Sequence, residues 1–169
     1  MSATESPSAA VLGKTTFTQT SDRELLATRT FDAPRALVWD ACTRCEHLRN
    51  WYGPRAMQMA SCESDLRVGG RFRYVLRGPD GMEHGFRGEF LEIEAPARVV
   101  NTWEWEPMPG HGSVETATFE ERDGRTTVTV HVRFGTAEDF AGWHQSGATS
   151  GMSESYDRLA ELVAGLRPR

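Results

Sequence analysis

The sequence lacks the features that mark membrane, nucleic-acid-binding or secreted proteins. No apolar run approaches the roughly 18 residues that a membrane helix needs, and no block of basic residues offers a surface for nucleic acid. Acidic and basic residues are mixed along the 169-residue chain, whose net charge is −5. The N-terminus has no basic segment followed by an apolar one, so no secretory signal is expected. We therefore predict a cytoplasmic protein with no nucleic-acid partner and no membrane insertion.

Cysteine is scarce, with only Cys42, Cys45 and Cys62 in the chain. An odd number argues against a closed disulfide framework. Cys42 and Cys45 form a C-x-x-C pair, a spacing found in redox and metal sites, but they lie in a predicted helix and no second pair exists. The prediction is three free thiols, as is usual in a reducing compartment.

Catalytic motifs are also absent. The sequence contains no G-x-S-x-G and no H-E-x-x-H, and its five histidines are scattered without metal-ligand spacing. Glu104 and Glu106 alternate with Trp103 and Trp105, so they point away from the aromatic face of their strand. No inward-facing carboxylate is assigned. We predict no catalytic residue, no metal and no cofactor.

The composition, 38% hydrophobic and 25% charged, is that of a globular protein, and the length suits one core. Residues 1–20 are rich in Ser, Thr and Ala and are predicted to be a flexible tail. Residues 21–169 are predicted to form a single domain.

Most of this domain shows the two-residue hydrophobic period of β-strands. Turn residues such as Asp123-Gly124 separate the strands, as in consecutive antiparallel hairpins. The strands are predicted at residues 24–31, 57–66, 70–77, 82–94, 98–106, 113–121 and 126–134.

Helical patterns occupy two other places. Two short helices are predicted after the first strand, the second near residues 46–50, and a long helix is predicted over 137–166. Because the last strand alternates Val with polar residues, its sheet is buried on one face, which this helix must cover. The expected fold is α+β, with a curved antiparallel sheet of six or seven strands around a long C-terminal helix.

Aromatic side chains of one parity and small residues of the last helix suggest an apolar cavity between sheet and helix. Large rings line such cavities, and glycine, which disfavours a helix by about 1 kcal/mol, leaves room opposite them. Close helix–sheet packing is the alternative explanation for the glycines. The predicted ligand-binding residues are Trp51, Phe72, Tyr74, Phe86, Trp103, Trp105, Trp143, Gly147, Gly151, Met152 and Tyr156.

Arg29 is a candidate polar residue of this cavity. It shares parity with Leu25 and Phe31 on the first predicted strand, so it faces inward if Phe31 does. A buried guanidinium needs a partner or an anionic ligand group. The alternative is a strand twist or bulge that leaves Arg29 exposed.

Five ordered segments resemble one bacterial family, which is similar to the C-terminal domain of the Hsp90 ATPase activator. They are F-D-A-P-R-A-L-V-W (31–39), E-H-L-R-N-W-Y-G-P (46–54), D-L-R-V-G-G-R-F-R (65–73), F-R-G-E-F-L-E-I (86–93) and S-G-M-S-E-S-Y-D-R-L (150–159). This family belongs to the START-like superfamily, also called SRPBCC or Bet v 1-like. The resemblance implies a helix-grip fold with a hydrophobic cavity.

The superfamily includes carriers, receptors, cyclases and sequestering proteins, so the fold alone does not select a function. With aromatics and no catalytic set, the residues favour non-catalytic binding of a small apolar or aromatic molecule. One alternative is a cyclase- or hydrolase-like enzyme acting on a hydrophobic or polyketide-type substrate. The other is a protein-binding module with an Hsp90-type partner, which only the family name suggests.

Overall fold

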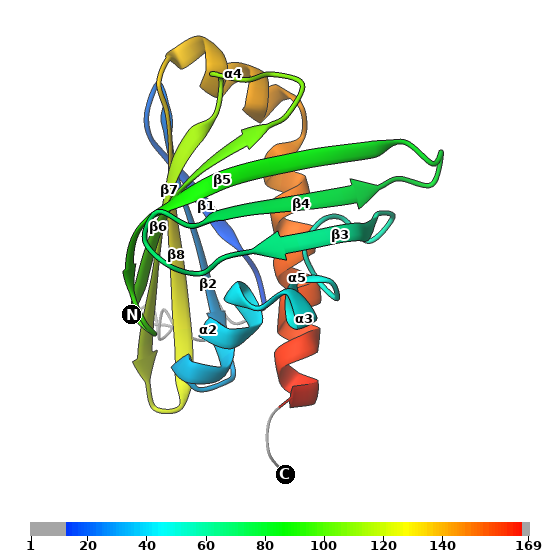
Figure 1. Ribbon diagram of the computed structural model, residues 1–169. Helices are drawn as coiled ribbons and strands as arrows, with labels where there is room; N and C mark the ends of the chain where they lie inside the picture. Colours follow the sequence, from blue (N-terminus) through cyan, green and yellow to red (C-terminus); the bar gives the residue numbers. More distant parts are fainter. Residues whose placement is uncertain (1–12, 167–169) are drawn as a thin grey trace.

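The computed structural model describes residues 13–166. One antiparallel eight-stranded sheet, in the order β1-β2-β8-β7-β6-β5-β4-β3, curves around helix α5 (Figure 1). The elements are β1 (Thr16–Ser21), β2 (Glu24–Phe31), α2 (Arg35–Thr43), α3 (Cys45–Leu48), β3 (Gln58–Ser64), β4 (Arg71–Arg77), β5 (Glu83–Glu94), β6 (Arg98–Trp105), β7 (Ser113–Arg122), β8 (Arg125–Phe134), α4 (Ala137–Gln145) and α5 (Ala148–Leu166). The α+β architecture is confirmed, with one strand more than the upper prediction.

Strands β3 to β8 follow one another as hairpins, and β2 joins the sheet beside β8. At the turn between β7 and β8, Asp123 and Gly124 have φ of 54° and 76°. Two consecutive left-handed residues make the tight turn that matches the twist of a hairpin. The seven predicted strands agree with the structure to within two residues at each end.

The additional strand is β1, and it corrects the predicted tail. Residues 16–20, assigned to a flexible segment, pair with β2 from Thr16 opposite Thr28 to Gln19 opposite Leu25. Most β1 side chains are exposed, so the strand forms by backbone pairing with the edge of β2 rather than by hydrophobic burial. Strand β1 was not predicted because its polar residues show no hydrophobic alternation. The remainder of the predicted tail, residues 1–12, lies outside the described residues.

The predicted single helix over 137–166 is two helices. Gly147, between α4 and α5, has a φ of +88°, a left-handed conformation that ends a helix and that glycine adopts without strain. Thr136 begins α4 by accepting a hydrogen bond from the backbone N–H of Asp139. Gly147 therefore acts at a helix break, not as space inside one helix.

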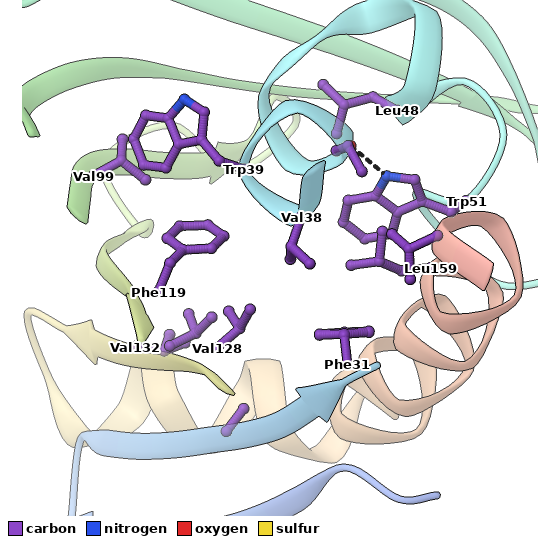
Figure 2. Close-up of a cluster of buried hydrophobic side chains, with 14 of the residues drawn as sticks. Phe31, Val38, Trp39, Leu48, Trp51, Val99, Phe119, Val128, Val132 and Leu159 are labelled. Atoms are coloured by element: carbon purple, nitrogen blue, oxygen red, sulfur yellow. Dashed lines mark hydrogen bonds between the residues drawn. The ribbon is translucent and has the colours of Figure 1, made fainter. Parts of the chain in front are cut away.

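The hydrophobic core lies between the concave face of the sheet, α2 and the second half of α5 (Figure 2). Phe119 and Val132 come from the sheet, Trp39 from α2 and Leu159 from α5, and each is at most 5% exposed. Trp39 and Phe119 meet edge to face with centroids 5.1 Å apart. Within residues 13–166, no helix has the length and apolarity needed to cross a membrane.

Candidate ligand cavity

A loop that we call the strap, residues 49–57, crosses helix α5. The Gly53 N–H donates to Ser155 Oγ at 2.9 Å. Arg158 Nη1 donates back to the carbonyl oxygens of Gly53 at 2.8 Å and Pro54 at 3.2 Å. Gly53 has a φ of +99°, a left-handed conformation that favours glycine. These hydrogen bonds, with those of Arg55 to Glu154 and Glu161, hold the strap against one side of α5.

A disulfide between Cys45 and Cys62 closes the base of the strap by joining α3 to β3. The prediction of three free thiols was wrong for this pair. Their 17-residue separation carries no pairing signal, and only the packing of α3 beside β3 brings the two Cα atoms to 5.8 Å. Cys42 is free. Burial raises the pKa of its thiol to about 12, so the thiol stays protonated and unreactive at neutral pH.

Aromatic side chains from the strap and the sheet meet on the concave side. The rings of Tyr52 and Tyr74 lie 5.0 Å apart, and Tyr74 stacks on Phe72 at 4.8 Å. Trp103 Nε1 donates to the Tyr52 hydroxyl at 3.3 Å, which links β6 to the strap. Phe86 stacks on Trp103 at 5.4 Å. Two predicted cavity residues, Tyr74 and Trp103, therefore contact Tyr52, and Phe72 and Phe86 stack on those two. Tyr52 itself is not among the residues predicted from the sequence.

Helix α5 covers this aromatic surface unevenly. Its buried residues, Ser155, Leu159 and Val163, all lie beyond its first turns, whereas residues 148–154 include none. A Cβ added to Gly151 would have only Pro54 Cγ, at 3.8 Å, within 4 Å. Close packing therefore does not require this glycine, and the alternative explanation for it is not supported.

Met152 and Tyr156 are the predicted cavity side chains contributed by α5. Both are half-buried and pack against the core. The centroid of the Tyr156 ring lies 6.1 Å from that of Trp51 and 6.3 Å from that of Phe31. Tyr156 therefore contacts both the strap and β2.

Glu115 on β7 is an inward-facing carboxylate, which corrects the earlier failure to assign one. In the sheet it lies opposite Asn101 of β6 and Val132 of β8, and Val132 is fully buried. Burial raises the pKa of Glu115 to about 7, while a hydrogen bond with the Asn101 side chain acts in the opposite direction. Its parity with buried Phe119, four residues on, was the signal in the sequence.

Arg29 faces inward, which agrees with the first of the two alternatives and not with an exposed side chain at a twist or bulge. It is 4% exposed, and its Nη1 lies 2.6 Å from Asp157 Oδ1 on α5. Its guanidinium also lies over the Phe31 ring, 5.8 Å from the centroid. Arg29 therefore has a carboxylate partner within the protein and needs no anionic ligand group to compensate its charge.

The three remaining predicted tryptophans differ in their surroundings, and of these Trp51 lies next to Tyr52, with ring centroids 5.8 Å apart. Trp51 is in the core and donates from Nε1 to the Ala41 carbonyl at 2.8 Å (Figure 2). Trp105 lies near His84, with centroids 6.4 Å apart. Trp143 lies on α4, the helix before Gly147, and packs on Phe134 with ring centroids 5.4 Å apart.

The opposite, outer face of the sheet carries a broad groove of about 1100 Å³. Two ion pairs lie in it, with Arg73 bound to Glu106 at 2.8 Å and Arg87 to Glu104 at 2.7 Å. Both glutamates point away from the aromatic face, as predicted. In the part of the chain that the structure describes, no three His, Cys, Asp or Glu side chains gather as a metal site.

Solved structures of bacterial proteins share this fold. A protein from Rhodobacter sphaeroides is 25% identical with a TM-score of 0.84, over 90% of this chain and 99% of the other. A protein from Mycobacterium smegmatis is 25% identical with a TM-score of 0.79, over 88% and 96%. The Aeromonas hydrophila protein described as AHSA1-like is 23% identical with a TM-score of 0.68, over 85% and 96%. No curated protein matches the chain significantly.

The family described as "Activator of Hsp90 ATPase homolog 1-like protein" matches residues 32–164. This span runs from the end of β2 into the last turn of α5, so it contains the strap, the sheet from β3 to β8 and Glu115. The chain belongs to this Hsp90 ATPase activator homologue-like family, within the START-like superfamily.

Proposed function

We propose that the protein binds a small apolar or aromatic molecule, without catalysis, between the concave face of the sheet and the first half of α5. One observation carries this proposal. Glu115, Tyr52, Tyr156 and Cys42 lie deep enough for desolvation to raise their pKa, yet each keeps accessible surface. Side chains that are surrounded by protein and still keep accessible surface support the presence of a cavity beside them.

Ala117 supports the same location. It lies on the concave face of β7, between Val99 and Val130, which are 7% and 6% exposed. Although both neighbours are buried, Ala117 is only half-buried. A ligand here would gain roughly 25 cal/mol for each Å² of apolar surface removed from water, before the costs of association.

The test is fluorescence titration with N-phenyl-1-naphthylamine, an uncharged aromatic probe. The parent protein should bind it, and Ala117→Leu should remove binding by filling the space while the circular dichroism spectrum is retained. Thr118→Leu, which places the same side chain on the outer face of the same strand, is the matched control and should bind as the parent does. Equal binding by Ala117→Leu would contradict the location, and no binding by the parent would contradict the function.

Acid–base catalysis on a hydrophobic substrate is the second candidate, because Glu115 combines an inward position with a pKa near neutrality. Turnover of an aryl ester that Glu115→Gln abolishes would favour this candidate over simple binding. Binding to an Hsp90-type partner rests on the family description alone.

A further inference from the structure

Glu115 is the cavity's unpaired charge. The inward guanidinium of Arg29 binds Asp157, and Arg158 is bound to the backbone of the strap. Within residues 13–166, Glu115 makes no ion pair, and its polar contact is with the uncharged Asn101 side chain. A buried carboxylate without a cation is unfavourable unless something compensates its charge.

Aromatic rings lie on the same face of the sheet as this carboxylate. Trp103 on β6 lies opposite Ser113, two residues before Glu115 on β7, so Trp103 and Glu115 are diagonal neighbours. The Tyr52 ring on the strap lies 5.0 Å from that of Tyr74 on β4. Trp103 contacts Tyr52. Faces of aromatic rings carry partial negative charge and attract cations, most strongly where water is excluded.

The hydroxyl groups add hydrogen-bonding capacity. The Tyr52 hydroxyl accepts from Trp103 and keeps its own proton to donate. Among the described residues, the hydroxyls of Tyr74 and Tyr156 have no hydrogen-bond partner. Phenolic and carboxylate oxygens in one place can accept several N–H donors from a single group.

We propose that Glu115 anchors a protonated amine, so that the cavity selects aromatic molecules bearing a primary or secondary ammonium group. This inference rests on the proposed binding function and specifies its ligand class. The ammonium group would donate to the Glu115 carboxylate, with tyrosine oxygens as further acceptors, while the aromatic body lies against Phe86 and Trp103. An anionic ligand would be repelled at the same place.

The pH dependence follows from the pKa of Glu115, which is about 7 without ligand. Because the amine needs the ionised carboxylate, its affinity should rise as pH increases through 7. The other groups around Glu115 stay uncharged here, because burial raises the pKa of Cys42 on α2 and of Tyr52, Tyr74 and Tyr156.

Two further charged or titratable groups share the concave face. Arg29 on β2 forms an ion pair with Asp157 on α5. His84 on β5 lies opposite the buried Leu76 and beside Trp105. The variant His84→Gln therefore tests whether His84 contributes to the pH dependence.

The experiment is isothermal titration calorimetry with 1-naphthylmethylamine and its uncharged analogue 1-naphthylmethanol, from pH 5.5 to 8.5. The amine should bind about tenfold or more tightly at pH 8.5 than at pH 5.5, whereas binding of the alcohol should not rise. Glu115→Gln should weaken amine binding at pH 8.5 at least about tenfold and leave alcohol binding within about twofold. Glu120→Gln, on the exposed face of β7, and His84→Gln should keep the pH dependence.

Three results would overturn the inference. If the alcohol binds as tightly as the amine and Glu115→Gln changes neither, the cavity exists but Glu115 is not an amine anchor. If amine affinity falls as pH rises, a protonated Glu115 acts as a donor instead. If neither compound nor N-phenyl-1-naphthylamine binds, the proposed function itself fails.

Discussion

Arg29 on β2 and Asp157 on α5 form an ion pair, with Nη1 and Oδ1 2.6 Å apart. This pair joins the sheet to the helix that lies against its concave face. The side chain of Arg29 is only 5% exposed and that of Asp157 is 48% exposed, so the pair runs from the interior to the surface. Arg29 Nε is buried without a partner among the described residues. The guanidinium therefore depends heavily on this one carboxylate.

Asp157→Asn should lower the free energy of unfolding, because it leaves a buried guanidinium without a counter-charge. We expect a loss of about 1–3 kcal/mol, below the usual value for a fully buried pair since water reaches Asp157. Urea unfolding measures it. Asp22→Asn, in the exposed pair with Arg23, is the control and should stay within about 0.5 kcal/mol of the parent. Equal effects of the two changes would contradict this account of Arg29.

Thiol titration in denaturant should detect one thiol, Cys42, without reductant and three after reduction. Cys45→Ser combined with Cys62→Ser should lower the free energy of unfolding by about 3 kcal/mol, because the strap loop is no longer closed in the unfolded chain. The reduced parent serves as the control and should match this double variant. Three thiols without reductant would mean that the disulfide does not form.

The contribution of Glu115 to stability should fall as pH rises from about 4.5 to 7. The pKa of Glu115 is raised from 4.5 to about 7 in the folded protein, so between these values the folded state binds more protons than the unfolded one. Glu115→Gln removes this effect and should stabilise the protein at pH 8 by an amount on the order of 2–3 kcal/mol, with little change at pH 4. The measurement is urea unfolding at both pH values. Glu120→Gln is the matched control, and a pH-independent gain would refute the assignment.

Ser155→Ala should loosen the strap. It removes the acceptor of the Gly53 N–H in a buried position, and a buried donor left unsatisfied costs about 1–3 kcal/mol. Amide exchange at Gly53 should become faster, and the free energy of unfolding should fall. Ser150→Ala, an exposed position on the same helix, is the control. Unchanged exchange at Gly53 would show that the strap is held by its other contacts with α5, from Arg158, Glu154 and Glu161.

Local pattern was sufficient for most of the fold. Alternation in β8 was sufficient to decide which of its residues face the core, because side chains on a strand point to opposite sides by geometry. The same rule, applied to β7, would have placed Glu115 inside beside Ala117 and Phe119. It was missed because Thr116 and Thr118 on the outer face blur the contrast between the two faces.

The sequence by itself determined the element order, the one-sided sheet, the family and the aromatic strip that includes Phe72, Tyr74, Phe86 and Trp103, because each depends on local period or on segment similarity. Only the tertiary structure decided the Cys45–Cys62 pairing and the strap's attachment to Ser155. These contacts join residues far apart in the chain, and no periodicity encodes which distant groups meet. The charge state of Glu115 belongs with them, since it depends on how much water the folded chain excludes.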